Sequence, residues 1–141
     1  MYLSANVNRM IYDTTTIEVR KGETDIGLTL SEKFHHALGA VHGSVYFKLL
    51  DDACFFAVNS LVEDVFVLTI SFEIQLKRPV TEGQIYARAI VTEPGESVFH
   101  ASAILYNEAN KEIAQGKGTF VKSKEPLSPE IGYRDPNDPI T

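Results

Sequence analysis

The amino-acid sequence predicts an α+β domain in which one long buried helix is wrapped by a single antiparallel sheet of five to six strands. Two observations predict this fold class. Residues 43–61 form an apolar segment without proline or internal glycine. The second half of the chain holds four strand-like segments joined by short, turn-like links. An unspecified α+β sandwich is the alternative that these patterns leave open.

The apolar positions of residues 43–61 cover most of the helical circumference rather than one stripe. They include Val45, Phe47, Leu49, Leu50, Ala53, Cys54, Phe56, Ala57, Val58 and Leu61. A helix that is apolar nearly all round is a buried helix. Cys54 is the only cysteine in the chain. Its apolar surroundings predict an inert core thiol, and a single cysteine excludes an intrachain disulfide.

Strict alternation of apolar and polar residues predicts the longest strand at residues 66–76. Its even positions are all apolar, so we expect the even face to be buried. Later strands are predicted at residues 84–92, 98–106 and 113–121. Because the links are short, the four strands favour an antiparallel meander. Two weaker strands are predicted before the helix, at residues 14–20 and 27–31.

The end of the domain combines small residues with a proline-rich tail. Ala114, Gly116 and Gly118 share one face of the last predicted strand, and we expect the buried helix to pack against them. Residues 123–141 contain four of the six prolines. Since proline blocks regular structure, this segment is predicted to be an irregular tail that follows a domain spanning residues 1–122.

Composition excludes several classes of function. Hydrophobic residues make up 44% and charged residues 23% of the 141-residue chain, which fits one globular domain. The net charge of −6 and the scattered basic residues argue against nucleic-acid binding. No stretch is long and apolar enough to span a membrane, and the N-terminus lacks the layout of a signal peptide. We therefore expect a cytoplasmic protein with no membrane or nucleic-acid partner.

Two adjacent acids, Asp51 and Asp52, lie inside the apolar helix, where an isolated ionised carboxylate is costly. Consecutive helical residues point about 100° apart, so the two acids are not expected to act as one carboxylate pair. Lys48 lies four residues before Asp52 and predicts a helix-surface ion pair with it. Asp51 has apolar neighbours on the helical wheel, which makes it the candidate for chemistry.

The start of the helix, His42-Gly43-Ser44, is a candidate oxyanion site. A helix N-terminus presents N–H groups without intrahelical partners and the positive end of the helix dipole. Gly43 would let a ligand approach the backbone closely, and such N–H groups stabilise a developing negative oxygen. The alternative is that Gly43 only shapes the turn into the helix.

Three short motifs occur in a defined order. His42-Gly43-Ser44 is followed after six residues by Asp51, and the other two are Phe72-Glu73-Ile74-Gln75-Leu76-Lys77-Arg78-Pro79-Val80 with Gly83, and Ala114-Gln115-Gly116-Lys117-Gly118-Thr119-Phe120. Together they resemble the hotdog-fold acyl-CoA thioesterases, in the branch of the phenylacetyl-CoA thioesterase-like proteins. The hotdog fold is one long helix wrapped by a sheet. The resemblance covers residues 12–122, which is the whole predicted domain.

The resemblance implies a hydrolase for a small aromatic or short- to medium-chain acyl-CoA, with its active site between the subunits of a homodimer. Asp51 would be the nucleophile or general base, and the Gly43 N–H of the other subunit would polarise the thioester carbonyl. Thr69 matches a residue that helps to place the attacking water. His36 matches an amide residue at the reaction centre, and His42, which begins the glycine motif, is a further candidate catalytic residue. Relatives often pair their dimers, which implies a homotetramer.

The sequence departs from this pattern at two positions. Ser44 replaces the usual second glycine, which is expected to narrow the substrate entry or to add a hydroxyl contact. His36 replaces the amide residue. A neutral imidazole still donates a hydrogen bond, but its charge varies at about pH 6–7.

Residues for substrate binding are predicted at two places. Lys77 and Arg78, at the end of the longest strand, are candidates for binding the phosphates of CoA. The alternative is a solvated strand end. Phe55 on the buried helix is a candidate for lining the acyl pocket, although aromatic residues on such a helix are usually core residues.

Thioester hydrolysis needs a placed water, a carboxylate and an oxyanion site, so no cofactor is expected. His35, His36 and His42 lack the spacing of a zinc site, and no metal is expected. Two other functions stay open. One is a hotdog module that binds acyl-CoA without hydrolysis. The other is a hotdog hydratase or dehydratase, against which the position of Asp51 nine residues after His42 argues.

Overall fold

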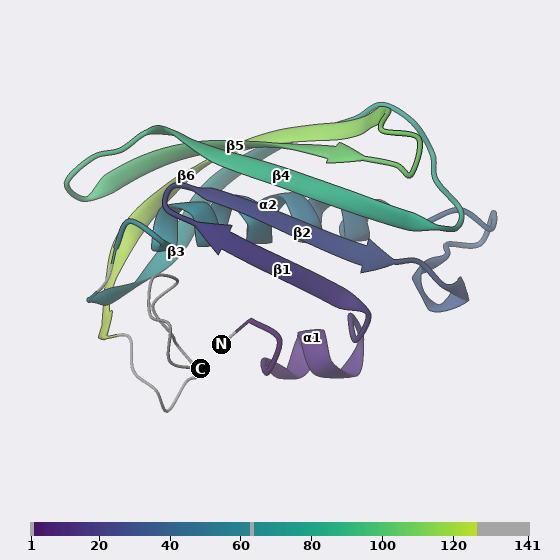
Figure 1. Ribbon diagram of the computed structural model, residues 1–141, viewed down its shortest axis with the longest axis horizontal. Coiled ribbons are helices and arrows are strands. Elements are labelled where there is room, and N and C mark those ends of the chain that lie inside the picture. The colour runs from purple at the N-terminus through teal and green to yellow at the C-terminus, as the bar shows by residue number, and fades with distance from the viewer. Residues whose placement is uncertain (1, 63, 127–141) are drawn as a thin grey trace.

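The computed structural model describes residues 2–62 and 64–126 and confirms the α+β class (Figure 1). One six-stranded antiparallel sheet has the order β1-β2-β4-β5-β6-β3. The elements are α1 (Asn6–Met10), β1 (Thr15–Arg20), β2 (Glu23–Thr29), the short 3-10 helix η1 (Glu32–Phe34), α2 (Gly43–Asn59), β3 (Val65–Leu76), β4 (Gln84–Glu93), β5 (Val98–Tyr106) and β6 (Glu112–Pro126).

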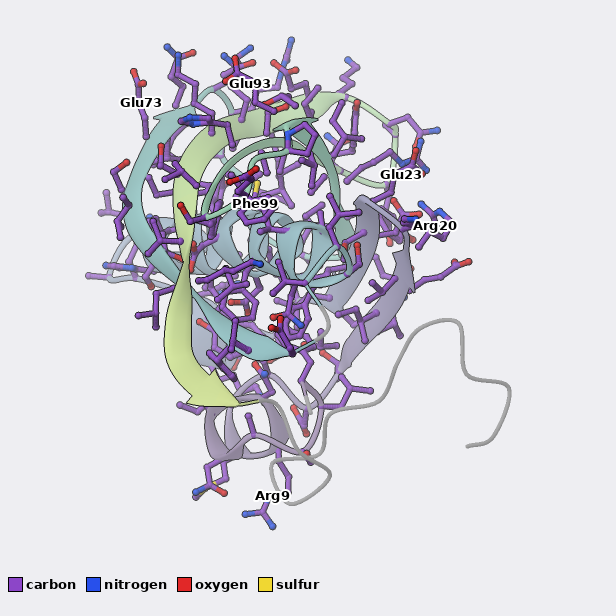
Figure 2. The ribbon with its side chains drawn as sticks, turned by 90° about the vertical axis from the view of Figure 1, so that its left-hand side faces the viewer. Arg9, Arg20, Glu23, Glu73, Glu93 and Phe99 are labelled. Carbon is purple, nitrogen blue, oxygen red and sulfur yellow. The ribbon has the colours of Figure 1, made fainter. Side chains whose placement is uncertain are left out.

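Helix α2 lies at the centre of the domain, and the curved sheet wraps around it (Figure 2). Six of its side chains are completely buried: Leu49, Leu50, Ala53, Cys54, Ala57 and Val58. Phe99 of β5 points into the space between sheet and helix, whereas Glu73 and Glu93 project from the outer face of the sheet (Figure 2). Burial raises the pKa of the Cys54 thiol, in agreement with an inert core residue. The predicted buried helix is therefore confirmed.

The predicted meander holds for β4, β5 and β6 but is wrong for β3. Strand β3 pairs with β6 at the edge of the sheet instead of pairing with β4. The other edge of β4 is occupied by β2. Strand β2 also begins before the predicted residue 27, at Glu23. Its side chains Ile26 and Leu28 are buried in the core. Strand β2 therefore occupies the position beside β4 that the short link between β3 and β4 had predicted for β3.

The prediction that the even face of β3 is buried along its whole length is wrong. The pairing register with β6 shifts between Thr69 and Ser71, which inserts an extra residue into β3. A bulge of this kind changes which side chains face the core. Before the bulge the buried residue is Val67, while Leu68 and Ile70 are 48% and 60% exposed. After the bulge, Phe72 and Ile74 pack against the core as predicted.

The two glycines of β6, Gly116 and Gly118, accommodate the ring of Phe72 of β3. A methyl group added to Gly116 would lie 2.5 Å from the Phe72 ring, and one added to Gly118 would lie 2.6 Å from it. The same ring packs edge-to-face against Phe47 of α2, with ring centroids 5.4 Å apart. Phe72 thus fills the space between the two glycines and the helix.

Strand β6 continues to Pro126, beyond the predicted end of the last strand at residue 121. The rest of the predicted proline-rich tail, residues 127–141, lies outside the described residues. At the other end of the chain, α1 was not predicted. This short helix packs beyond the β1 edge of the sheet (Figure 1).

Candidate active site

Asp51 lies in the third turn of α2 and faces Thr69 on strand β3. The Thr69 hydroxyl Oγ1 donates a hydrogen bond to Asp51 Oδ1 at 2.9 Å. Both side chains are half-buried. Thr69 and the buried Val67 are two residues apart and both precede the register shift, so they lie on the same side of β3, toward the helix. The structure therefore brings together two of the predicted site residues, with one carboxylate oxygen fixed by the hydroxyl.

The surroundings of Asp51 raise the pKa of its carboxyl group. Burial is the largest cause, and the negative charge of Asp52 acts in the same direction. The hydrogen bond from Thr69 and the positive charge of Lys48 lower the pKa, but burial prevails. A carboxylate with a raised pKa is a stronger base than an ordinary one, as general base catalysis near neutral pH requires.

Asp52 has a different environment from that of its neighbour. Its carboxylate forms the predicted ion pair with Lys48, and both side chains are about one-fifth exposed. Lys48 Nζ also donates to Asn8 Oδ1 at 2.7 Å and lies 5.0 Å from the ring centroids of Tyr2 and Tyr12. Three residues of the N-terminal segment thus enclose the ammonium group. No periodic pattern in the sequence marks these three residues.

Gly43 is the first residue of α2, and His42 is its N-cap. The Ser44 N–H donates to His42 Nδ1 at 3.1 Å, and the Val45 N–H donates to the His42 carbonyl at 3.0 Å. Neither of these capping bonds uses the Gly43 N–H. A methyl group at Gly43 would lie 3.3 Å from Leu76 Cδ1, so the space beside this backbone is narrow.

Gly43 and Asp51 do not share a site within one chain. They are eight residues apart on the same straight helix, which separates them by about 12 Å along the axis. One thioester carbonyl spans far less than this distance. A reaction that uses both groups on one carbonyl therefore needs Gly43 from one copy of α2 and Asp51 from another.

His36 lies in the exposed loop between η1 and α2. The ring Nδ1 of His36 accepts a hydrogen bond from the Leu38 N–H at 3.0 Å, and the backbone N–H of His36 donates to the Ala40 carbonyl at 2.9 Å. Within the part of the chain that the structure describes, no hydrogen bond connects His36 with Asp51 or Thr69. The structure thus assigns His36 to a turn and does not bring it to the carboxylate of its own chain.

Lys77 and Arg78 follow β3 at the end nearest to Gly43, because the preceding Leu76 contacts Gly43. The Lys77 ammonium pairs with Glu112. The Arg78 side chain is exposed, and its carbonyl accepts a hydrogen bond from Tyr46 Oη at 3.0 Å, which ties the first turn of α2 to this segment.

A shallow surface hollow is lined by Lys77, Arg78, Lys111 and Glu112. Three of its four lining residues are cationic, so it carries a net positive charge beside the start of α2. Lys111 was not among the predicted residues. It comes from the turn between β5 and β6, which the sheet brings next to the end of β3.

Phe55 lies one helical turn after Asp51 on α2 and is half-buried. Its ring packs against Phe56 and against Phe66 of β3, with centroid distances of 5.0 and 5.4 Å. Tyr2 continues this aromatic cluster by packing on Phe56. Phe55, which was predicted to line an acyl pocket, thus lies on the same side of α2 as Asp51, against the edge strand β3.

Within residues 2–62 and 64–126, no three His, Cys, Asp or Glu side chains are grouped so as to hold a metal ion. No helix among these residues is long and apolar enough to cross a membrane.

Comparisons with known proteins identify the family and the fold. The thioesterase superfamily matches residues 38–114, a range that includes Gly43, Asp51 and Thr69. A curated protein of Archaeoglobus fulgidus named "Putative esterase" is 27% identical over 120 residues, which cover 84% of this chain and 77% of that protein.

Solved structures show the same fold at low sequence identity. The E. coli PaaI protein from the phenylacetic acid degradation operon superposes with a TM-score of 0.81 and 20% identity over 91% of each chain. A thioesterase family protein from Silicibacter pomeroyi superposes with a TM-score of 0.77 and 24% identity, covering 86% of this chain and 91% of that one. These likenesses confirm the hotdog fold.

Proposed function

The chain belongs to the thioesterase superfamily, and we propose that it is an acyl-CoA thioesterase in which Asp51 either attacks the thioester carbonyl or activates the attacking water. Membership of this family makes the chain a thioester hydrolase. The proposed reaction adds water to the acyl carbonyl and breaks the carbon–sulfur bond, which gives the free acid and CoA.

The observation that carries the proposal is the hydrogen bond from Thr69 to Asp51. It holds a half-buried carboxylate in one orientation on a rigid helix, with Oδ2 left outside this bond. Burial raises the pKa of this carboxyl group, so the ionised form is a good proton acceptor or nucleophile. The other acid, Asp52, is already paired with Lys48 and is not proposed to react.

The separation of Gly43 and Asp51 supports a site shared by two subunits. In the proposed homodimer, the Gly43 N–H of one subunit donates to the thioester oxygen and stabilises the negative charge that develops there. Asp51 and Thr69 of the other subunit act on the carbonyl carbon. We further propose that such dimers pair to form a homotetramer and act in the cytoplasm, as expected from the sequence.

The distribution of charge and aromatic rings supports the orientation of the substrate. The cationic hollow at Lys77, Arg78 and Lys111 lies at the Gly43 end, where phosphate groups of CoA would be bound. The acyl group would then extend toward Phe55 and its aromatic neighbours. A small aromatic or a short- to medium-chain acyl group fits this arrangement.

Release of CoA from a panel of aryl- and alkyl-CoA thioesters tests the proposal. Asp51→Asn removes the charge with little change of shape, and its turnover should fall by at least about a hundredfold, the lower end for a lost general base. Asp52→Asn is the matched control and should keep turnover within about tenfold, because Asp52 is engaged by Lys48. Turnover that survives in Asp51→Asn would contradict the proposal, and binding without any release by the wild type would leave a ligand-binding module.

A single turnover in ¹⁸O-water tests whether Asp51 is the nucleophile, because label found in the protein requires a covalent intermediate on its carboxylate. If the carboxylate is the nucleophile, it forms an acyl–aspartyl anhydride and expels CoA; when water then attacks the Asp51 carbonyl of this anhydride, the first molecule of acid carries an unlabelled oxygen from Asp51 and the label enters the protein. Attack of water on the acyl carbon of the anhydride would put the label in the acid instead. If Asp51 is a general base, the label appears in the first acid released. Mass spectrometry of both the acid and the α2 peptide records the result.

A further inference from the structure

We infer that Ser44 is a positioning residue that holds the His42 ring in the tautomer with its proton on Nε2, so that His42 donates a second hydrogen bond beside the Gly43 N–H. This inference rests on the proposed function, because the acceptor would be the thioester oxygen bound at Gly43. It assigns a role to the hydroxyl group that stands in place of a second glycine.

The backbone fixes the tautomer of His42. Nδ1 lies 3.1 Å from the Ser44 amide nitrogen, which can only donate. Nδ1 must therefore accept, and it carries no proton. The Ser44 hydroxyl Oγ lies 2.8 Å from the same atom and must then donate to it as well. In a neutral imidazole the proton is left on Nε2, which becomes an N–H donor.

The other histidines of this loop follow the same arrangement. His36 Nδ1 accepts from the Leu38 N–H at 3.0 Å, and His35 Nε2 lies 2.7 Å from the Thr81 carbonyl, which can only accept. In neutral rings, both therefore carry their proton on Nε2. His35 uses its donor on Thr81. His42 is exposed at the start of α2. Both of its bonds with Ser44 use Nδ1, so they do not engage the Nε2–H group.

The position of His42 gives its donor a use. His42 directly precedes Gly43, and both belong to the cap of α2. Two donors on one developing oxyanion are the usual arrangement for acyl transfer, and removal of one costs about 10²–10³ in kcat. Ser44 does not touch the substrate in this role. It restrains the imidazole ring through Nδ1, and this orients the Nε2–H group toward the thioester oxygen bound at Gly43.

Two substitutions separate the capping role of His42 from its donor role. His42→Asn retains a short acceptor at the N-cap, where Asn is a preferred residue, but it lacks the distal N–H. Its Tm should stay near that of the wild type, while kcat should fall about a hundredfold. His42→Gln places an amide N–H near the former Nε2 and should recover part of kcat. Equal activity of the wild type and His42→Asn would overturn the inference.

The role of Ser44 is tested by a smaller effect and by NMR. Ser44→Ala retains the amide bond to Nδ1 but removes the hydroxyl bond, so kcat should fall about three- to tenfold, as expected for one neutral hydrogen bond, with less change in KM. Ser44→Thr retains a hydroxyl and should restore kcat. The control is Ser31→Ala, since the Ser31 side chain makes no capping bond at the start of η1. A loss of kcat in the control equal to that in Ser44→Ala would remove the evidence for Ser44.

Long-range ¹H–¹⁵N correlation spectra of the histidine rings give a readout that does not depend on activity. The His42 signals, assigned by their absence in His42→Asn, should show an unprotonated Nδ1 and a protonated Nε2 in the neutral ring. In Ser44→Ala the signals should shift or broaden, because one of the two bonds to Nδ1 is lost. A proton on Nδ1 would overturn the inference even if Asp51→Asn had confirmed the proposed function. Full turnover by Asp51→Asn would instead refute the proposed function without changing the tautomer.

Discussion

Asp51 and Asp52 are adjacent in the chain, yet α2 gives them opposite environments. Since consecutive helical residues diverge by about 100°, Asp52 reaches Lys48 and the N-terminal segment, while Asp51 reaches Thr69 on β3. The i,i+4 spacing in the sequence was sufficient to predict the first contact. The partner of Asp51 depends on a bulge in a strand that is distant in sequence, and residue type alone does not reveal the position of such a bulge.

The hydrogen bond to Asp51 should control the acid side of the pH profile. The bond favours the ionised carboxylate and lowers a pKa that burial has raised. Thr69→Val removes the bond but retains the shape, so the pKa of Asp51 should rise further. Because the ionised form is the active one, activity is lost as the pH falls through this pKa. The acid limb of kcat/KM should therefore move to higher pH, with activity regained at higher pH.

The matched control for this profile is Thr119→Val on β6, whose hydroxyl lies 3.2 Å from His100 Nδ1 rather than near Asp51. Its acid limb should coincide with that of the wild type. A limb that stays in place in Thr69→Val, or moves to lower pH, would contradict the assignment of Asp51 as the titrating group.

The backbone at Gly43 permits removal of a single N–H group. Proline is well tolerated at the first position of a helix, and the residue before it prefers an extended ψ. His42 already has φ −63° and ψ 142°. Gly43→Pro should therefore fold but lose kcat by about 10²–10³, as expected for a lost oxyanion donor. Gly43→Ala retains the N–H and adds only a methyl group beside Leu76, so kcat should stay within about tenfold of the wild type.

Steady-state kinetics with circular dichroism of both variants distinguish the chemical effect from misfolding. Equal losses in Gly43→Ala and Gly43→Pro would indicate that space, and not the N–H group, is what Gly43 provides.

At the scale of elements, the long alternating run of residues 66–76 predicted strand β3 but misassigned part of its buried face. Alternation describes a regular strand, and one inserted residue after Thr69 reverses the orientation of everything that follows. The buried helix was easier to predict, because its apolar residues cover the whole circumference and do not depend on register.

The contact between Phe72 and the glycines of β6 should be sensitive to a single methyl group. Gly116→Ala would place a carbon 2.5 Å from the Phe72 ring, so it should lower the free energy of unfolding by about 1–3 kcal/mol, as overpacking does. Phe72→Leu in the same chain should recover part of this loss, because the shorter side chain leaves space for the methyl group. Urea unfolding of the two single variants and the double variant measures the coupling, and strictly additive losses would contradict the proposed clash.

The N-terminal segment should stabilise α2 through Lys48. Lys48→Met leaves Asp52 unpaired in a site where its side chain is 20% exposed. The free energy of unfolding should fall by about 2 kcal/mol, less than the 3–5 kcal/mol for a fully buried pair. Lys48→Met with Asp52→Leu should be more stable than Lys48→Met alone, because no uncompensated charge remains. If both variants were as stable as the wild type in urea unfolding, the Lys48 contacts would contribute nothing to stability.

At the scale of the whole molecule, β3 is a twelve-residue strand at the edge of the sheet. It exposes Leu68, Ile70 and Leu76 at 48%, 60% and 56%. Long apolar edges of this kind invite pairing with another chain, and most natural proteins protect them. The proposed homodimer would cover this edge, which bears Thr69 and lies beside Asp51. Assembly and catalysis would then depend on the same strand.

A mixture of two inactive variants tests whether the active site is shared between subunits. Asp51→Asn and Gly43→Pro should each be nearly inactive alone. After denaturation and refolding at equal amounts, half of the dimers should contain one subunit of each kind. In a mixed dimer, one site combines the intact Gly43 of the first subunit with the intact Asp51 of the second, while the other site lacks both.

The mixture should regain about one quarter of the wild-type activity, as random pairing in a twofold-symmetric dimer requires. If Asp51 and Gly43 of one subunit served the same site, no mixed dimer would contain an intact site, and the mixture would be no more active than its components. Because each variant refolded alone is the baseline, the gain on mixing measures the shared site directly, whether or not the dimers pair further.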